Sequence, residues 1–594
     1  MNYLSVYSET VNGILNLKLL FNLHGKSFRM SRNSAESIGK TLKRIGISVQ
    51  KAQDKGGENG KKKGRKQEIS NHIHVQLLWP NGQIVNEEIS NIQGWKTGNM
   101  LNIGEFKFSV EENTPIVNSA KIPSVIMANF PIVPTLKLEF ANEANSQFKW
   151  FKCSEKLDVV NSCTLDVDEN LDRSGESLWI EVSQNFIYEP AVDDIGCIIR
   201  FSCKAGSHEK TAHNWFDVTS VSVVQAAPGF MPFESRHLYT IKPTIDEDIL
   251  RVVSYNILAD CYLDDEATCE TLYGYCPKYA LEIDYRQQLL LKEIVGYHGD
   301  IVCLQECGRR LFDHYLKPMM NARGYTGTVR YKSGVMLEGE AIFFDKMKFE
   351  LVSQNMFELK ESLLHNTCNI DLLQNIQAFP VVYEKLISRT TLAQVVVLQS
   401  IPSPQDYICI VNTHLYYKPD SSYIRNLQIM IVLNEVQKSL NELENRLEKE
   451  RPGGYRIGVV FCGDFNSLPG SGVVQLLSEG FLQSSHQDWS LQIVDDEDDF
   501  IASNVLEMSS FSHNLNLQNV CGFPDYTAYT HGFSGVIDYV FASKAHFDVH
   551  AVIPVPSIEE IQLYLALPSP VMPSDHVALV CELKWKEKKK CEKS

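Results

Sequence analysis

Six short segments of this chain combine an apolar run with side chains that can bind metals or move protons. In residues 457–467 the apolar run ends at Gly463, and Asp464 and Asn466 follow. The run predicts a buried strand, and burying a carboxylate and an amide at its end is costly unless they bind something. Taken alone, the segment also fits a strand that ends in an ordinary Asx turn. The choice between these interpretations depends on the other five segments.

The other five segments repeat this pattern with other chemical groups. Apolar runs end at Asn256, at Glu306 and at His414, a fourth run carries Asp538, and an Asp-His pair at 575–576 precedes the fifth. Oxygen-bearing side chains suit a hard cation such as Mg²⁺, which takes one or two protein carboxylates and keeps several waters. Glu306 is the best single candidate for a metal ligand. Six such segments in one chain are improbable by chance, so we expect their polar residues to meet at one rim of the fold.

The ordered motifs SYNIL, LQE, NTHL, GDFN, IDY and SDH, which lie between residues 254 and 576, identify a family. This set resembles the endonuclease/exonuclease/phosphatase superfamily, which includes exonuclease-III-like and DNase-I-like enzymes, and the match covers residues 248–586. The resemblance implies an α/β fold, a four-layer α/β sandwich in which two mixed sheets pack face to face with helices outside. The alternation of predicted strands and helices agrees with this architecture.

The resemblance implies how these residues would cleave a phosphodiester bond. Cleavage needs neutralised charge on the non-bridging oxygens, an activated water and help for the leaving oxygen. One or two Mg²⁺ ions, or Mn²⁺ in their place, can supply much of this. The implied metal-binding residues are Glu306, Asp464, Asn466, Asn256 and Asp575.

The same resemblance assigns roles to the catalytic side chains. Asp464 would accept the proton of the attacking water, although it could instead bind the metal. Asn466 and His414 would hold the scissile phosphate. His576 would donate a hydrogen bond to the developing negative charge, and Asp538 would orient this imidazole and favour its protonated form. A purely structural role is the alternative for either histidine.

Two longer motifs limit the range of expected substrates. The segments LYGYCP at 272–277 and NTHLYYKP at 412–419 resemble the deadenylase branch of the superfamily, and within it the mitochondrial 2′,5′-phosphodiesterases, which share a long N-terminal β region. In that branch a proline and a phenylalanine sandwich the adenine, and the matching positions are Pro419 and Phe533. Tyr416 and Lys418 of the same motif are further candidates for substrate binding. Stacking on an aromatic face contributes roughly 1–3 kcal/mol per base, but Phe533 could instead be a loop aromatic that covers the core.

The implied activity is that of a Mg²⁺-dependent 3′-to-5′ exoribonuclease that releases 5′-AMP from 2′,5′-linked oligoadenylates and from 3′,5′-linked poly(A) tails. Two alternatives stay within the fold, a nuclease of abasic DNA and a phosphatase of lipid or inositol head groups. A third alternative is a non-catalytic adaptor, which predicts degraded catalytic positions. None of the six motifs is degraded.

Length and composition limit the remaining possibilities. The chain has 594 residues, too many for one core, so two or three domains are expected. A net charge of −17 argues against binding of nucleic acid by the whole surface, but it allows a local positive field at one site. The 15 cysteines form no C-x-x-C pair and are expected to be reduced. No apolar run approaches the roughly 20 residues of a membrane span.

The expected domain order is a small N-terminal α+β region at 1–130 with a basic Gly/Lys linker at 51–69, a β-sandwich at 131–228, a linker at 229–247, the catalytic domain at 248–586 and a charged tail at 587–594. The sandwich resembles an immunoglobulin-like domain because a central Trp150 precedes an Asp-x-Gly corner and a strand. Helical spacing of apolar residues predicts helices at 34–49, 285–295 and 423–447.

The sequence leaves two alternatives for the cellular location of the protein. The resemblance implies the mitochondrial matrix. Residues 1–22, however, contain Lys18 as their one basic residue and include Glu9, whereas a transit peptide is rich in Arg and poor in acids. The cytoplasm is therefore the second expectation.

Overall fold

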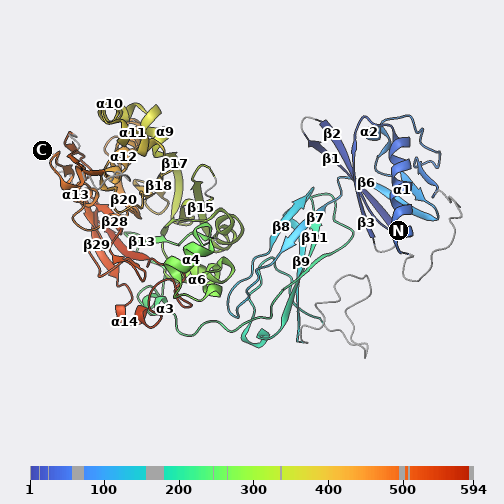
Figure 1. Cartoon of the computed structure of the whole chain (residues 1–594), viewed down its shortest axis with the longest axis horizontal. Helices are drawn as coiled ribbons and strands as arrows, with labels where there is room; N and C mark the ends of the chain where they lie inside the picture. Colours follow the sequence, from blue (N-terminus) through green and yellow to red (C-terminus); the bar gives the residue numbers. More distant parts are fainter. Residues whose placement is uncertain are drawn as a thin grey trace. The chain divides into compact units, whose positions relative to one another are not determined.

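The computed structural model describes residues 2–11, 14–23, 26–56, 73–154, 179–244, 246–263, 265–334, 337–493, 502–505 and 509–587. The chain forms two compact units (Figure 1). The first contains Met1–Ser124 and Pro134–Gln225, and the second contains Val125–Val133 and Ala226–Ser594. Much of the expected basic linker at 51–69 and almost all of the expected charged tail lie outside the described residues.

The N-terminal part of the first unit is a six-stranded sheet with one helix against it. The strand order is β3 (Lys26–Asn33), β2 (Ile14–Leu23), β1 (Asn2–Val11), β6 (Phe106–Glu112), β5 (Met100–Ile103), β4 (Val75–Leu78). Alternate residues of β2, such as Leu17 and Leu19, form one buried core with Ile38 and Leu42 of α1 (Ile38–Gly56). Because successive strand residues point to opposite faces, the other face of this sheet is free of α1.

The rest of the first unit is β-structure. A four-stranded sheet has the order β10 (Ile180–Ser183), β9 (Asn142–Cys153), β11 (Ile198–Gly206), β12 (Phe216–Thr219), and β7 (Ile116–Lys121) pairs with β8 (Thr135–Glu139). The predicted central tryptophan, Trp150, is fully buried and packs against Phe201 and Tyr188. Asp194 of the predicted corner accepts a hydrogen bond from the Tyr188 hydroxyl.

The second unit contains two mixed six-stranded sheets. The first sheet has the order β15 (Tyr325–Tyr331), β16 (Gly339–Asp345), β14 (Ile301–Gln305), β13 (Ile249–Asn256), β30 (Leu579–Trp585), β29 (Phe547–Ile553). The second has the order β17 (Phe349–Glu358), β18 (Leu392–Ser400), β19 (Asp406–His414), β20 (Arg456–Asp464), β28 (Asp538–Ser543), β25 (Leu517–Asn519). Both mix parallel and antiparallel pairs, as the resemblance implied.

The two sheets pack face to face and helices cover their outer faces. Val252 of the first sheet and Ile410 of the second share one core, whereas Cys409 and Val411 belong to a core with α12 (Ser422–Glu450). On the far side, α6 (Ile283–Gly296) meets the first sheet through a hydrogen bond from Tyr255 to Glu293. Burial on both faces explains why these strands read as continuous apolar runs. The predicted four-layer sandwich is confirmed.

The three predicted helices are present as α1, α6 and α12. α6 and α12 extend beyond both predicted ends, whereas α1 begins and ends later than predicted. The shorter helices of the second unit are α3 (Pro232–His237), α4 (Glu266–Tyr273), α5 (Lys278–Leu281), α7 (Arg309–Leu311), α8 (Lys317–Ala322), α9 (Leu359–His365), α10 (Ile370–Gln377), α11 (Pro380–Ile387), α13 (Gly472–Glu479) and α14 (Ile558–Gln562).

The segment 229–247, expected to be a linker, contains α3 and packs into the second unit. Arg236 is buried and donates hydrogen bonds to the carbonyl oxygens of Pro554 and Ala578 and to the hydroxyl of Tyr297. Phe233 is fully buried beside it. A single arginine that reaches three distant partners leaves no periodic signal in the sequence, so the prediction missed this packing.

Candidate active site

Strand register brings three of the predicted residues into one row. β19 and β20 are parallel neighbours with His414 opposite Asp464, and β28 runs antiparallel to β20 with Asp538 opposite Asp464. The strands adjoin at their polar ends, so the three side chains share one edge of the second sheet. Asn256 ends β13, and Glu306 directly follows β14, at the facing edge of the first sheet.

His576 and Asp538 form a buried hydrogen-bonded pair. His576 Nδ1 lies 2.8 Å from Asp538 Oδ2, and His576 Nε2 lies 3.8 Å from Asp464 Oδ2. Burial opposes the charged imidazolium, but the carboxylates of Asp538, Asp575 and Asp464 outweigh it and hold the pKa of His576 well above its ordinary value. The pair can therefore present a cationic N–H donor to an anionic substrate.

Asp464 lies at the centre of the cluster. Its Oδ2 accepts a hydrogen bond from Asn256 Nδ2 at 2.9 Å, and its Oδ1 accepts one from the backbone N–H of Asn466 at 2.9 Å. Burial and the charge of Asp538 raise the pKa of Asp464 to about 7, against the influence of His576. A carboxylate with this pKa is a stronger proton acceptor than an exposed aspartate, which suits a general base.

His414 is the neutral imidazole of the site. Burial, assisted by the positive charges of Lys332 and His576, lowers the pKa of His414 well below its usual range. Asn466 Nδ2 lies 2.9 Å from His414 Nε2 and 3.0 Å from the carbonyl oxygen of Leu415. The amide therefore donates to both, and the proton of His414 resides on Nδ1.

This arrangement changes what each side chain can offer a phosphate. His414 Nδ1 is buried and has no hydrogen-bond partner among the described residues. Both N–H groups of Asn466 are engaged, so this residue offers only its Oδ1 to a ligand. His414 Nδ1 lies 3.9 Å from Glu306 Oε1, and its contact with a phosphate stays a prediction. Asn466 is placed to orient His414 and to provide a carbonyl oxygen to a cation.

The residues predicted to bind a metal fit a hard divalent ion. Glu306 Oε1 accepts a hydrogen bond from Asn256 Nδ2 at 3.0 Å, and Oε2 accepts one from the backbone N–H of Ala259 at 2.9 Å. Burial, with the nearby carboxylates of Asp575 and Glu338, raises the pKa of Glu306 to about 7. Buried acids that disfavour one another's ionisation are what a divalent cation would neutralise.

Asn256 connects the two sides of this cluster, since the same amide nitrogen donates to both Glu306 and Asp464. Among the described residues, Asp464, Asp538 and His576 are the group whose ligand atoms all lie within 4.8 Å of one another. The hydrogen bond between His576 and Asp538 already occupies two members of that group. Glu306 and Asp575 offer the oxygen ligands that a hard ion prefers, but with Asp464 they do not form such a group among the described residues.

One cavity of about 630 Å³ is lined by six of the predicted catalytic and metal-binding residues: Glu306, His414, Asp464, Asn466, Asp575 and His576. Besides the predicted residues, its lining includes several that the sequence did not single out: Tyr262, Tyr273, Lys332, Arg389 and Thr391. Tyr273 donates a hydrogen bond to Asp575 Oδ2 at 2.8 Å, and Lys332 forms an ion pair with the buried Glu338. Tyr273 lies inside the LYGYCP motif, but Lys332 follows a strand with no distinguishing pattern.

The predicted adenine-binding residues are placed less centrally. Tyr416 lines the cavity and lies under the guanidinium of Arg389, 4.7 Å from its ring centroid. Pro419, Lys418 and Phe533 are not among the described residues that line it. Phe533 is 41% exposed in the loop between β26 (Ala528–Tyr529) and β27 (Ser534–Gly535). Its ring is therefore free to meet a ligand.

Two family models match the chain. The model of the endonuclease/exonuclease/phosphatase family matches residues 253–576, and the model of the 2′,5′-phosphodiesterase 12-like N-terminal domain matches residues 114–225. The chain belongs to the endonuclease/exonuclease/phosphatase family. This confirms the predicted family and the prediction of a hydrolytic enzyme that cleaves phosphate esters.

Individual relatives resemble nearly the whole chain. Human 2′,5′-phosphodiesterase 12 is 37% identical over 581 residues, which are 95% of this chain and 91% of the human protein. The CCR4-Not complex 3′-5′-exoribonuclease subunit Ccr4 of Schizosaccharomyces pombe is 27% identical over 57% of this chain and 49% of that protein. A solved structure of ANGEL2, a 2′,3′-cyclic phosphatase, is 25% identical and covers 57% of this chain and 96% of its own, with a TM-score of 0.45.

Proposed function

We propose that this protein is a Mg²⁺-dependent 3′-to-5′ exoribonuclease that removes 5′-AMP from 2′,5′-linked oligoadenylates and from 3′,5′-linked poly(A) tails. The observation that carries the proposal is the single cavity in which a raised-pKa carboxylate, a cationic imidazole and a neutral imidazole meet the acids around Glu306. Similarity to 2′,5′-phosphodiesterase 12 over 95% of the chain supports the substrate class.

The chain's own residues supply most of the reaction. A water attacks the phosphorus atom, Asp464 accepts its proton, and the bond from phosphorus to the ribose oxygen of the preceding nucleotide breaks. His576 and His414 Nδ1 donate hydrogen bonds to the non-bridging oxygens, where negative charge grows. The released ribose oxygen takes up a proton from solvent, and the phosphate leaves on the 5′-carbon as 5′-AMP.

A divalent ion, which Glu306 and Asp575 would hold with Asn466 and Asn256 beside them, would supply charge neutralisation at the phosphate. We favour Mg²⁺ because the donors are oxygens, with Mn²⁺ as a substitute. The 2′ and 3′ ribose oxygens are adjacent leaving groups, so one such site can serve both linkages.

The direct test is product analysis. The protein and an Asp464→Ala variant are incubated with 2′,5′-linked and 3′,5′-linked oligoadenylates, with Mg²⁺ and with EDTA. Stepwise release of 5′-AMP that requires both the metal and Asp464 is the expected result. An intact fold that leaves both substrates uncleaved would falsify the proposal, and abasic DNA and phosphoinositides would be tested next.

Location and membrane association bear on the RNA pool that the enzyme would meet. Among the described residues, no helix has the length and apolar character needed to cross a membrane. The resemblance to mitochondrial 2′,5′-phosphodiesterases supports a mitochondrial matrix location, where the enzyme would shorten the poly(A) tails of mRNA. Fractionation of cells that express the tagged chain tests this, and recovery with the cytoplasm would favour the alternative.

A further inference from the structure

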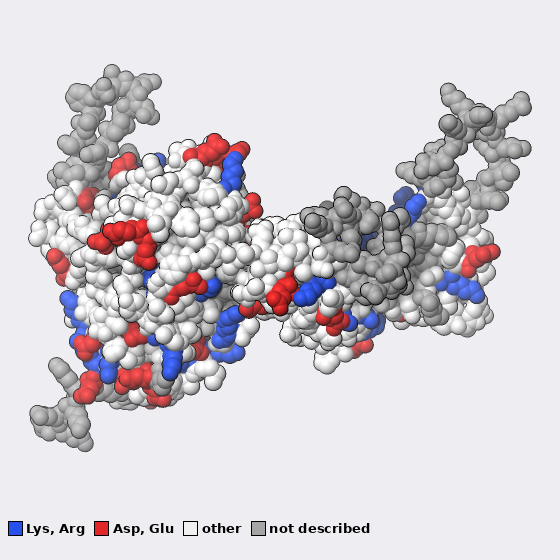
Figure 2. Space-filling view, turned by 90° about the horizontal axis from the view of Figure 1, so that it is seen from below, with Lys and Arg blue, Asp and Glu red and all other residues white. Residues whose placement is uncertain are grey.

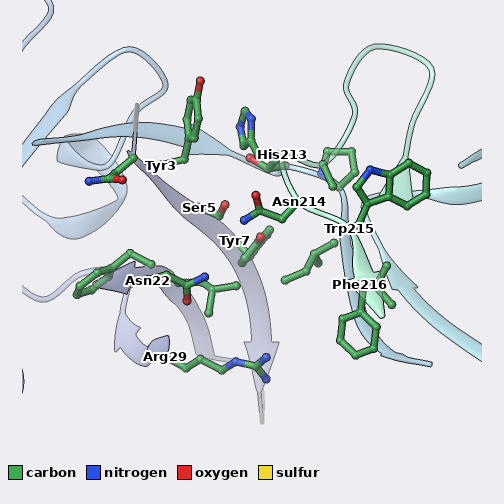
Figure 3. A pocket seen from close by; sticks show the side chains of 17 residues that line it. Tyr3, Ser5, Tyr7, Asn22, Arg29, His213, Asn214, Trp215 and Phe216 are labelled. Carbon is green, nitrogen blue, oxygen red and sulfur yellow. The ribbon is translucent and has the colours of Figure 1, made fainter. Parts of the chain in front are cut away.

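A second cavity system lies within the first unit, and none of the predicted catalytic residues lines it. One cavity of about 550 Å³ opens on the face of the N-terminal sheet that α1 does not cover (Figure 3). Ser5 and Tyr7 of β1 form one wall, and Asn214 and Phe216, from the segment that leads into β12, form the other. The walls therefore come from both halves of the unit.

An adjoining cavity of about 480 Å³ continues along the same sheet face. The two cavities share Tyr7, Leu20, Arg29 and Ile116 in their linings. Two cavities that meet at common residues form an elongated groove. This shape suits an extended chain of several units better than one compact small molecule.

The lining of this groove has the chemistry of a site for stacked bases. Tyr3 and His213 stack on each other with ring centroids 3.5 Å apart and planes within 6°, and Figure 3 shows them side by side at one end. Trp215 is 37% exposed and has the ammonium of Lys149 5.7 Å from its ring centroid. Exposed aromatic rings near cations accept bases of any sequence by stacking.

Polar groups in the groove are available for the backbone and the base edges. Arg29 borders both cavities and is exposed, and its guanidinium makes no hydrogen bond or ion pair with any described residue. Asn22 and Asn214 line the first cavity with exposed amides, which can donate and accept hydrogen bonds. An exposed guanidinium that no described residue pairs is suited to a phosphate.

A few side chains determine the charge of this groove. The chain as a whole is acidic, and the face of the second unit in Figure 2 mixes acidic and basic residues without a continuous patch of either sign. The groove itself has two basic side chains in its lining, Arg29 and Lys18, because the Lys and Arg residues of α1 lie on the other side of the sheet. Two acids oppose this locally, Glu111, which binds His213, and Glu139 at the far end of the second cavity. We therefore expect phosphates near Arg29 rather than near Glu139.

We propose that this groove binds single-stranded RNA, namely the part of an adenylate substrate upstream of the nucleotide being removed. The inference rests on the proposed function, which makes RNA the substrate. Because both units belong to one chain, a tail held in the groove stays at a high effective concentration for the active site. Long substrates then bind better than short ones, with no change in the chemistry.

The test measures RNA binding by the full chain in EDTA, which prevents turnover. The probe is a fluorescein-labelled 3′,5′-oligoadenylate of about 20 nucleotides, longer than a typical single-strand site. Arg29→Glu and Trp215→Ala are each expected to weaken binding by about fivefold or more, since each removes a phosphate or stacking contact. Lys43→Glu is the matched control, because it makes the same charge change on exposed α1, outside both cavities.

Turnover of an adenylate dinucleotide, whose two nucleotides flank the scissile bond and leave none for the groove, is measured in the same variants and is expected to stay unchanged. Equal loss of binding in Arg29→Glu and Lys43→Glu would show that RNA binding depends on net charge and not on the groove, and it would overturn the inference. Unchanged binding in both groove variants, with circular dichroism showing them folded, would also overturn it and would leave the groove to a ligand of another class, such as a peptide. Failure of the proposed function would show differently, as RNA bound through Arg29 but never cleaved.

Discussion

The two imidazoles in the active-site cavity differ in charge: His576 is cationic and His414 is neutral. The neighbours of each explain the difference. Asp538, Asp575 and Asp464 favour the cation at His576. His414 is buried and faces the positive charges of Lys332 and His576, so it stays neutral. Division of labour between titratable groups follows from such differences in environment.

Replacing Asp538 with Asn tests the cationic state of His576. The variant keeps the shape but loses the nearest negative charge, so the pKa of His576 falls. Catalysis needs the protonated form, and therefore the alkaline limb of kcat/KM should move to lower pH, with a loss of about 10²–10⁴-fold above neutral pH. The measurement is kcat/KM between about pH 5.5 and 9.

Asp548→Asn, on the exposed edge of β29, is the control for this profile because its carboxylate is 69% exposed. An alkaline limb that stays in place in Asp538→Asn would mean that His576 does not need its charge.

Metal binding can be read without any activity measurement. The carboxylate of Glu306 is buried among other acids, so a divalent ion should stabilise the fold, by about 2.7 kcal/mol at a hundredfold excess over Kd. Mg²⁺ is expected to raise the Tm of the wild-type protein. Glu306→Gln should largely abolish this rise, whereas Asp548→Asn should keep it.

The Mg²⁺-induced rise in Tm should also depend on pH in a defined direction. The pKa of Glu306 without metal is about 7, so protons compete with the ion below that pH. The Mg²⁺-induced rise in Tm should shrink as the pH falls from about 7.5 to 5.5. A rise of equal size in Glu306→Gln at every pH would place the ion elsewhere.

At the scale of elements, the sequence predicted strand ends better than strand neighbours. Polar residues at the ends of apolar runs identified Asn256, Glu306, His414 and Asp464 as site residues, and the structure brings them together. Their exact pairing was beyond the sequence, because the row of His414, Asp464 and Asp538 depends on register between strands far apart in the chain. Hydrophobic patterns specify which face of a strand is buried, not which strand lies beside it.

The sequence also failed to predict polar contacts made by single side chains. Lys332 lines the active-site cavity, and α3 is fixed by one buried arginine. Neither feature has a period or a motif, since each depends on a few long-range hydrogen bonds. The site was therefore predictable where residues follow strands and unpredictable where loops supply them.

Docking of α3 against α6 should make stability pH-dependent. His237 of α3 lies 3.0 Å from the carbonyl oxygen of Glu293, and burial, with the positive charge of Arg236, lowers the pKa of His237 to about 4. Protonation of His237 is harder in the folded state than in the unfolded chain. The stability that neutral His237 contributes is therefore complete above the unfolded pKa of about 6.5 and is lost as the pH falls toward 4.

The test compares Tm against pH for the wild-type protein and His237→Gln. The variant should be less stable at neutral pH, because it loses ring contacts with Phe233 and Tyr297. Its Tm should fall less steeply between about pH 6.5 and 4.5, since it lacks the titrating group. Parallel curves for the two proteins would show that His237 does not contribute to the acid sensitivity.

At the scale of the whole molecule, the two units are not consecutive in sequence. The chain leaves the first unit after Ser124, contributes Val125–Val133 to the second, and returns to the first at Pro134. Within the second unit, Gln288 of α6 hydrogen-bonds to the backbone of Val125 and Met127. The catalytic unit thus includes Val125–Val133, a strap from the N-terminal half of the chain. A domain boundary at residue 130 would cut this strap, and a boundary at residue 226 would separate it from the rest of the catalytic unit.

Phe130 should be the main anchor of this strap. Its side chain is 1% exposed, packs in a core with Leu289 and Tyr285, and has Lys292 5.2 Å from its ring centroid. Phe130→Ala should cost about 3–5 kcal/mol, and the loss should fall on the catalytic unit. A two-unit chain need not unfold in one step, so each unit requires its own probe.

Loss of phosphodiesterase activity on heating reports the catalytic unit, and far-ultraviolet circular dichroism reports both units. Phe130→Ala should lower the temperature of activity loss by several degrees, about 1–2 °C for each kcal/mol in a unit of this size. Phe140→Ala, in the first unit and 38% exposed, is the matched control and should leave that temperature unchanged. Equal inactivation temperatures for Phe130→Ala and the wild type would contradict the strap, because removing a fully buried ring cannot leave the unit that contains it equally stable.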